Sequence, residues 1–199
     1  MKIVVGLGNP GQEYSSTRHN VGFLAVEELR RRLGPGAKVK QRNAWIERLS
    51  FDAGPILLMR PRTYMNRSGS AVQQLLESEE ASVANLLVVC DDLYRPFGSL
   101  RLRTSGSHGG HNGLRSIIDC LGTTEFARLR IGIGPAEGDQ DHADFVLESF
   151  SREESARLPE IIDRAADCVT TALSEGIKMA MNRYNRRPAE DSGGDEKSP

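Results

Sequence analysis

The feature that most constrains the fold is a continuous apolar run, Leu-Leu-Val-Val at residues 86–89, followed after Cys90 by Asp91 and Asp92. An uninterrupted run of this kind is typical of a strand buried on both faces, as in the parallel sheets of α/β proteins. Ligands in such sheets bind beyond the carboxyl ends of the strands. The run therefore predicts a parallel sheet that ends in two carboxylates where a site forms.

Strands and amphipathic helices alternate along the rest of the chain. Short apolar or alternating runs predict strands at 2–7, 45–51, 56–59, 99–103 and 128–134. Helical spacing of apolar residues predicts helices at 21–33, from Ser68, at 114–121, and after a capping box formed by Ser151 and Glu154. Asn20 stands where a side chain caps the first of these helices. The alternation predicts one three-layer α/β domain, with a mixed, partly parallel, twisted sheet flanked by helices.

The bulk composition suits one soluble domain, with 199 residues of which 38% are hydrophobic. We expect the domain to span 1–187, because 188–199 is acidic and rich in Gly, Ser and Pro, as disordered tails are. No apolar run approaches the roughly 18 residues of a membrane helix, and none reads as a signal peptide. The cysteines lack metal spacing and indicate reduced thiols in a cytoplasm: Cys90, Cys120 and Cys168.

Four short islands combine asparagine, histidine and glycine, and they lie at 6–11, 17–20, 64–66 and 108–113. Asparagine and histidine are poor helix and strand formers, so local structure does not explain them. Neutral amides and imidazoles set among glycines suit a site that orients a polar, uncharged substrate and moves one proton. Each asparagine alone also reads as a turn or cap residue, and only their combination favours substrate binding.

The first island, Gly-Leu-Gly-Asn-Pro-Gly, matches the G-x-G-x-x-G pattern of dinucleotide-binding loops. Pro10 interrupts the pattern, and a polar stretch at 12–16 separates it from the next helix. No acidic residue ends a second strand about twenty residues later, where one contacts the ribose. A nucleotide cofactor is therefore the weaker interpretation.

His19 precedes a predicted helix, and Asp91 ends a predicted strand. A carboxylate fixes the tautomer and raises the basicity of a neighbouring imidazole, so the two together suggest a general base. Neither a serine elbow nor a reactive-cysteine pattern accompanies them, which favours water as the nucleophile. His108 and His111 are three residues apart, but the glycines between them and the lack of further ligands at suitable spacing argue against a metal.

Arginine is concentrated between residues 95 and 130, a stretch that contains six arginines and only two acidic residues, Asp119 and Glu125. Such an excess beside a glycine-rich loop is typical of phosphate contacts. A solvated basic face explains the same excess equally well.

Taken together, six ordered motifs resemble the bacterial peptidyl-tRNA hydrolases. Between residue 3 and about 134 they read Gly-Leu-Gly-Asn-Pro-Gly, Thr-Arg-His-Asn-Val-Gly, Pro-Arg-Thr-Tyr-Met-Asn-Arg-Ser-Gly, Asp-Asp-Leu, Gly-Gly-His-Asn-Gly-Leu and Arg-Leu-Arg-Ile-Gly-Ile-Gly. The segment 137–147, which we expect to be mobile, and the capped helix after it fit the lid and C-terminal helix of that family. The resemblance thus reaches about residue 187.

The resemblance implies hydrolysis of the ester between the C-terminus of a peptide and the 3′-terminal ribose of tRNA. It implies that His19 is the general base, that Asp91 orients it, and that Asn9 holds the water or stabilises the oxyanion. The residues implied to bind substrate are Tyr14, Tyr64, Met65, Asn66, His111 and Asn112, and those implied to contact tRNA phosphate are Arg103 and Arg130. A cytoplasmic monomer with no cofactor, no metal, no membrane and no obligate protein partner is expected.

Three departures from the family pattern affect its loops. Cys90 stands where relatives often have histidine, Tyr94 replaces an acid, and Ser105 and Ser107 interrupt a loop that is commonly richer in glycine. A rival interpretation is a non-catalytic RNA-binding relative of splicing-factor type, which would keep the fold and a basic face. The complete set of catalytic side chains favours the hydrolase.

Overall fold

The computed structural model of the protein describes residues 1–134 and 141–185. Within them a seven-stranded sheet has the strand order β2-β3-β4-β1-β5-β7-β6. The strands are β1 (Lys2–Gly6), β2 (Ala37–Val39), β3 (Ala44–Leu49), β4 (Ile56–Pro61), β5 (Leu86–Pro96), β6 (Leu100–Arg103) and β7 (Ala127–Gly134).

The sheet is parallel in its middle and antiparallel at both edges. β1 pairs in parallel with β4 and with β5, and β5 pairs in parallel with β7. The pairs β2–β3, β3–β4 and β6–β7 are antiparallel. The prediction of a mixed, partly parallel sheet is confirmed. Because β1, β5 and β7 run in the same direction, their carboxyl ends lie at the same end of the sheet.

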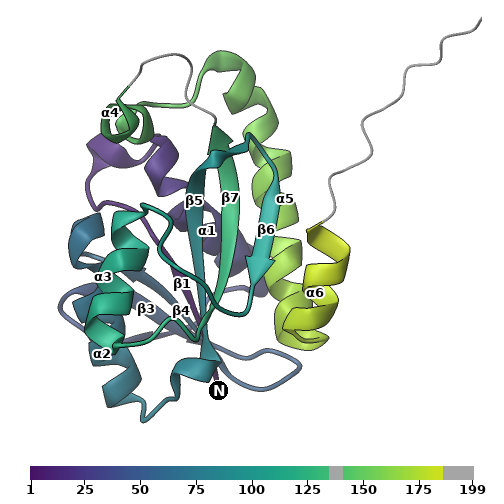
Figure 1. Ribbon diagram of the computed structural model, residues 1–199. Coiled ribbons are helices and arrows are strands. Elements are labelled where there is room, and N and C mark those ends of the chain that lie inside the picture. The colour runs from purple at the N-terminus through teal and green to yellow at the C-terminus, as the bar shows by residue number, and fades with distance from the viewer. Residues whose placement is uncertain (135–140, 186–199) are drawn as a thin grey trace, which may run out of the picture.

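Helices cover both faces of this sheet, which gives the predicted three layers (Figure 1). They are α1 (Val21–Leu33), α2 (Ser68–Ser78), α3 (Asn112–Leu121), α4 (His142–Leu147), α5 (Arg152–Ser174) and α6 (Ile177–Tyr184). Four short 3-10 turns connect them: η1 (Gln12–Tyr14), η2 (Arg18–Asn20), η3 (Met65–Arg67) and η4 (Val83–Asn85). Figure 1 shows α2 and α3 together on one side, α5 and α6 on the other, and α4 beyond the ends of β5 and β7.

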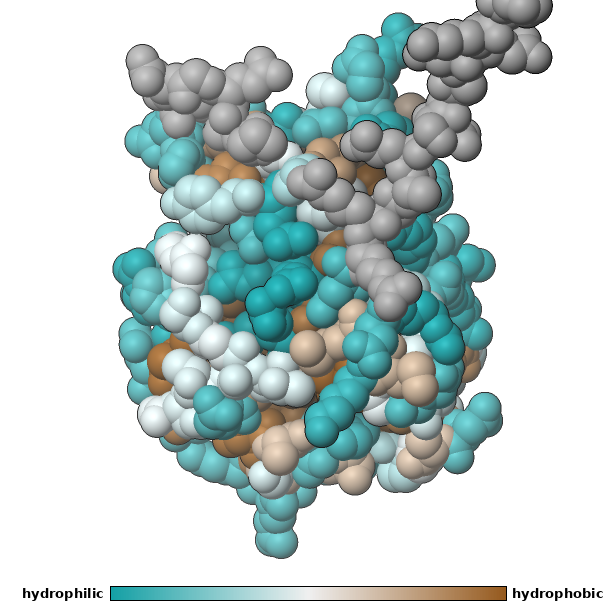
Figure 2. Space-filling view, turned by 45° about the vertical axis from the view of Figure 1, so that its right-hand side comes forward, coloured by the Kyte–Doolittle hydropathy of each residue, from teal (hydrophilic) through white to brown (hydrophobic). Residues whose placement is uncertain are grey.

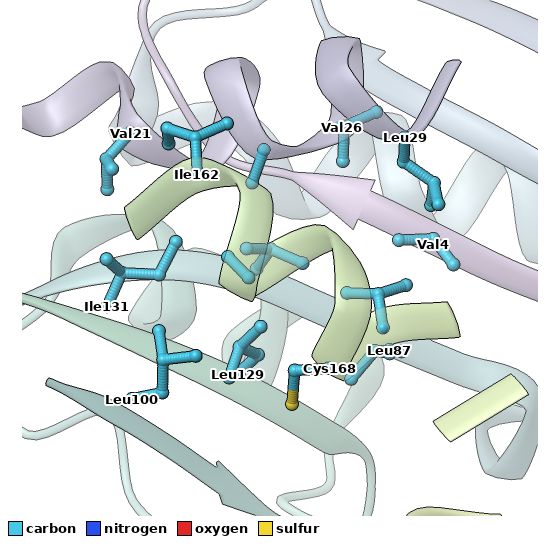
Figure 3. Packing of buried hydrophobic residues seen from close by; sticks show 14 of the residues in the cluster. Val4, Val21, Val26, Leu29, Leu87, Leu100, Leu129, Ile131, Ile162 and Cys168 are labelled. Carbon is cyan, nitrogen blue, oxygen red and sulfur yellow. The ribbon is translucent and has the colours of Figure 1, made fainter. Parts of the chain in front are cut away.

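The alternation of side chains along the strands builds a separate core on each face. Val4 and Leu87 pack with α1 and α5, as Figure 3 shows, around Ile162 and Cys168. Their strand neighbours Ile3, Val5, Leu86 and Val88 belong to the other core, beside α2 and α3. Burial of apolar surface on both faces explains why the central strands read as continuous apolar runs.

The local signals at helix ends were read correctly in one case and incorrectly in another. Both hydrogen bonds of the predicted capping box are present at the start of α5: Glu154 N donates to Ser151 Oγ at 3.2 Å, and Ser151 N donates to Glu154 Oε2 at 2.7 Å. The prediction of Asn20 as a side-chain cap of α1 is wrong, because its side chain makes no capping bond there. That amide instead contacts Asn9, as described below.

The element boundaries differ from the prediction mainly at β5. This strand continues through Asp91 and Asp92 to Pro96, because an irregularity after Asp92 lets Pro96 pair with Gly134 of β7. The carboxylates therefore lie within the strand and not at its end. The short strand β2 and the helix α6 had no counterpart in the prediction.

The expected acidic tail at 188–199 lies outside the described residues. Of the segment 137–147, which was expected to be mobile, 137–140 also lies outside them, and the rest includes α4. Among the described residues, no helix has the length and hydropathy needed to cross a membrane. On the face drawn in Figure 2, hydrophobic residues are visible only in separate places among hydrophilic ones.

Candidate active site

Two imidazoles share one carboxylate oxygen at the centre of the site. Nδ1 of His19 lies 2.8 Å from Oδ1 of Asp91, and Nε2 of His111 lies 3.0 Å from the same oxygen. His19 comes from η2, Asp91 from β5 and His111 from the start of α3. His19 is 7% exposed and Asp91 is 2% exposed. We call these three residues the floor of the site.

The hydrogen bonds of the floor fix where its protons lie. Nδ1 of His111 accepts from the backbone N–H groups of Gly113 and Leu114 at 3.1 and 3.2 Å, so it carries no proton. His111 must then be protonated at Nε2 and donate from there to Asp91. The ionised carboxylate accepts also from Nδ1–H of His19, which leaves Nε2 of a neutral His19 with its lone pair. This is the tautomer that a general base needs.

Electrostatics strengthen this base. Burial alone lowers the pKa of His19, but the charge of Asp91 and its hydrogen bond outweigh it and raise the pKa above the ordinary value of 6.5. Burial likewise works against ionisation of Asp91, yet the charges and hydrogen bonds of the two histidines hold its pKa well below the usual range. The carboxylate therefore stays ionised while His19 binds or releases a proton.

Asn9 and Asn20 form a second hydrogen-bonded unit beside His19. Asn20 Oδ1 accepts from Asn9 N at 2.8 Å, and Asn20 Nδ2 donates to Asn9 O at 3.0 Å. Asn9 Oδ1 accepts in turn from Met65 N at 2.8 Å, which orients the Asn9 amide. Its Nδ2 donates to no residue in the described part of the chain. Sequence reasoning missed the clamping role of Asn20, although it directly follows His19.

Two cavities adjoin the floor. The first has a volume of about 300 Å³, and its walls include Asp92, Tyr94, Gly109, Gly110 and Arg130. The second has a volume of about 260 Å³, and its walls include Asn9, Tyr64, Met65 and Asn66. Both are lined by His19 and Asn112, and by Ala143 and Val146 of α4. Helix α4 is thus the roof of the site, and His19 lies between the cavities.

The structure brings most of the predicted binding residues to these cavities. Tyr64, Met65, Asn66 and Asn112 line the second one. Tyr14 lines neither, and it contacts Tyr64 edge to face, with ring centroids 6.4 Å apart. His111, predicted among the substrate-binding residues, lines the first cavity and also belongs to the floor.

The two arginines predicted to contact phosphate differ in their surroundings. Arg130 lines the first cavity, donates to Asp92 Oδ2 at 3.3 Å, and donates to the backbone oxygens of Ser107 and His108 at 3.1 and 2.9 Å. Arg103 is exposed at the end of β6, beside Arg128 in the sheet register, and lines neither cavity.

Arg128 is a further residue that sequence reasoning did not single out. It is 1% exposed and donates to the backbone oxygens of Gly106, Ser107, Thr124 and Phe126. With Arg130 it fixes the loop that leads to His111. The two arginines hold this loop through the carbonyl groups of Gly106, Ser107 and His108, so these contacts do not depend on the side chain of Ser107. Of the described non-glycine residues, only Glu80 has a positive φ.

The roof is anchored beside His19 by Arg18. Its guanidinium lies 4.2 Å from the ring centroid of Phe145 in α4. It also forms ion pairs with Glu148 at 3.2 Å and with Glu154 at 2.9 Å. Backbone pairing between Thr17 and Ser149 joins the same two segments.

Two alternatives raised by the sequence have physical answers here. A Cβ on Gly6 would lie 2.3 Å from the carbonyl oxygen of Gly22, and one on Gly8 would lie 2.7 Å from the ring of Phe23. These glycines therefore serve the close approach of α1 to β1, which explains the pattern without a pyrophosphate. Of the two histidines considered as metal ligands, His108 accepts from Gly110 N at its Nδ1, and His111 accepts from Gly113 N and Leu114 N at its Nδ1. The floor atoms lie close enough together for a cation, but Nε2 of His111 carries a proton that it donates to Asp91 and therefore has no lone pair to offer.

Cys90 neighbours Asp91 but faces the other side of the sheet. Its side chain is fully buried in the core beside α2 and α3, and burial raises the pKa of its thiol. Cys90 is therefore a packing residue and not a nucleophile.

Comparison with known proteins identifies the family. The family model described as "Peptidyl-tRNA hydrolase" matches residues 3–192. The chain is 50% identical over 186 residues to a peptidyl-tRNA hydrolase of Chloroflexus aggregans (93% of this chain and 99% of that one) and 40% identical over 187 residues to one of Syntrophotalea carbinolica (94% and 98%). The crystal structure of the peptidyl-tRNA hydrolase from Acinetobacter baumannii has a TM-score of 0.85 and 36% identity, covering 93% of this chain and 94% of that one. These matches confirm the resemblance found in the sequence, and the chain belongs to the peptidyl-tRNA hydrolase family.

Proposed function

We infer that the protein hydrolyses the ester bond of peptidyl-tRNA and releases free tRNA and peptide. The observation that carries this function is the position of His19: its Nδ1 is bound to a buried, ionised Asp91, and the ring lines two cavities at once. An ester joins two unlike groups, an acyl chain and a ribose. A base between two cavities suits such a substrate.

In the mechanism we propose, Nε2 of His19 takes a proton from water as the water attacks the ester carbonyl. The carboxylate of Asp91 stabilises the imidazolium that results, and this imidazolium then supplies a proton to the departing ribose oxygen. The Asn9 Nδ2–H group is suited to holding the water or the oxyanion, because Met65 N fixes the Asn9 side chain and Asn20 fixes the Asn9 backbone. A base and one oxyanion donor together lower the barrier by about 5–10 kcal/mol.

The second cavity is suited to the peptide. Asn66 and Asn112 present amides that both donate and accept, which allows recognition of a peptide main chain of any sequence. Met65 supplies an apolar part and Tyr64 an aromatic part of the wall of the same cavity, and Tyr14 contacts Tyr64 edge to face. Arg103 and Arg130 remain our candidates for contacts with tRNA phosphate.

The rival RNA-binding function without catalysis explains less of the site. A protein that only binds RNA needs no buried carboxylate to raise the basicity of a histidine. The arrangement of the floor therefore favours the hydrolase over the splicing-type relative.

The test measures release of the blocked amino acid from N-acetyl-aminoacyl-tRNA, with unblocked aminoacyl-tRNA as control and EDTA present. Cleavage of the blocked substrate alone is expected, and it would support both the need for a peptide-like amide and independence from metal. Retained RNA binding without cleavage would contradict the proposal.

We further propose a cytoplasmic monomer that acts without cofactor or obligate partner, to be checked by light scattering of the active protein.

A further inference from the structure

An exposed tryptophan with two arginines against its ring lies on β3, outside both cavities. Trp45 is 44% exposed and stands opposite Arg60 in the register of β3 and β4. The guanidinium carbons of Arg60 and Arg62 lie 5.6 and 5.1 Å from the centroid of the Trp45 ring. At such distances the ring attracts each guanidinium by a cation–π interaction. We call these three residues the tryptophan patch.

The two arginines of the patch differ in their acidic partners. Arg60 forms an ion pair with Glu27 of α1 at 2.9 Å, and the glutamates beside the patch, Glu27 and Glu47, both pair with Arg30. Arg62 is exposed, and within residues 1–134 and 141–185 it pairs with no carboxylate. A guanidinium that lies against a ring keeps N–H groups free to bind a carboxylate. Arg62 is therefore a positioned cation that can accept an anion from outside the described chain.

The patch continues from the second cavity, on the side away from the first. The walls of the second cavity include Asn9 and Tyr64, which follow β1 and β4, whereas those of the first include Asp92 of β5 and Arg130 of β7. β3 is the next strand beyond β4 in the sheet. Arg62 precedes Tyr64 by two residues, which span at most about 7 Å. A peptide that leaves the second cavity in this direction therefore reaches the patch within a few residues.

The second cavity encloses only a short part of a peptide. Its volume of about 260 Å³ lies below the usual range of pockets that enclose a drug-sized ligand. It therefore holds the C-terminal end of the peptide beside His19, and the residues upstream must lie on the surface outside.

Resting on the proposed function, we propose that the tryptophan patch is a subsite for the upstream part of the peptide, in which Arg62 binds an acidic side chain. The ring of Trp45 holds the guanidinium in place, so this contact costs less conformational entropy than a contact to a freely moving arginine. The protein then binds peptidyl-tRNAs that carry an acidic residue at the matching position more tightly than their neutral counterparts.

The test uses N-acetyl-tetrapeptidyl-tRNAs that carry either glutamate or glutamine at the second, third or fourth residue from the ester. For the unaltered protein we expect KM to be about threefold to fivefold lower with glutamate at one of these positions, which is the effect of one exposed ion pair. Arg62→Gln is expected to abolish this difference and Arg62→Lys to keep part of it. Trp45→Ala is expected to reduce it, because the ring that positions Arg62 is lost.

Two controls separate the subsite from general effects of charge. Arg31→Gln removes the same charge from an exposed position of α1 and is expected to leave the preference for glutamate unchanged. N-acetyl-aminoacyl-tRNA has no upstream residue, so we expect all four variants to cleave it with the KM of the unaltered protein.

Equal KM for glutamate and glutamine at all three positions would overturn the inference, as would a preference that survives Arg62→Gln. If Arg62→Gln raises KM equally for every substrate, the short one included, the patch binds tRNA and not the peptide, and the inference is wrong. If the unaltered protein does not cleave even N-acetyl-aminoacyl-tRNA, the proposed function itself fails, which that substrate shows without any variant.

Discussion

The floor and the roof of the site are built in different ways. In the floor, buried polar groups hold one another: Asp91 accepts from two histidines, and His111 also accepts from two backbone groups. The roof, α4, is mostly exposed and buries only Phe145 among its residues, where Arg18 contacts it. At the first turn of α4, His142 makes a long contact with Tyr94. The difference indicates that the floor is preorganised for proton transfer, whereas the roof is the part that can adjust to substrate.

His19→Ala tests the floor most severely. Without the imidazole, no group is left at this position to take the proton from water, so we expect kcat to fall by about 10²–10⁴-fold. The melting temperature and the affinity for uncleaved tRNA are expected to stay close to those of the unaltered protein. Near-normal turnover would show that His19 is not the base.

Asp91→Asn tests the charge of the floor and has a second readout in pH dependence. His19 must be neutral to act, and its raised pKa means that activity declines as the pH falls through a value above 6.5. Without the carboxylate, burial lowers the pKa of His19, so this acidic decline is expected to move to lower pH while the maximal rate falls by about 10²-fold. A decline at the same pH in the variant would mean that Asp91 does not set the basicity of His19.

Arg18→Gln tests the link between the floor and the roof. The substitution leaves Glu154 and the carbonyl of Phe145 without their cation, and we expect it to reduce the free energy of unfolding by about 2–4 kcal/mol. A loosened roof is expected to raise KM more than it lowers kcat. Arg31→Gln, which removes an exposed ion pair on α1, is the control. We expect it to leave the free energy of unfolding, KM and kcat nearly unchanged. A loss confined to kcat would place Arg18 with the floor.

Arg103→Ala is expected to have the smallest effect, because Arg103 lies outside both cavities. Loss of one phosphate contact should weaken tRNA binding and reduce the slope of log Kd against log salt by about 0.7–0.9. Cleavage of a minimal N-acetyl-aminoacyl ester without tRNA should be unchanged. An equal loss on that ester would contradict a phosphate role.

The sequence predicted those features that depend on neighbours in the chain. The capping box of α5 spans three residues, and the buried strand at 86–89 is visible as an apolar run. The contacts of the floor join residues 72 and 20 positions apart, and Asn20 bonds to a residue 11 positions away. Such contacts depend on how the strands pair. His19 and Asp91 are still predictable as a pair, because an imidazole before a helix and a carboxylate after a buried strand suggest a general base without knowledge of the contact. The proton position on His111, the clamp of Asn20 and the burial of Arg128 carry no such local signal.

The most direct test of the account is a ¹⁵N NMR measurement of the imidazole nitrogens above the pKa of His19. The chain has four histidines, so His19→Gln and His111→Gln variants assign the two relevant sets of signals. We predict that neutral His19 carries its proton on Nδ1 and that His111 carries its proton on Nε2. A proton on Nε2 of His19 would contradict the central claim, because that nitrogen could then not accept a proton from water.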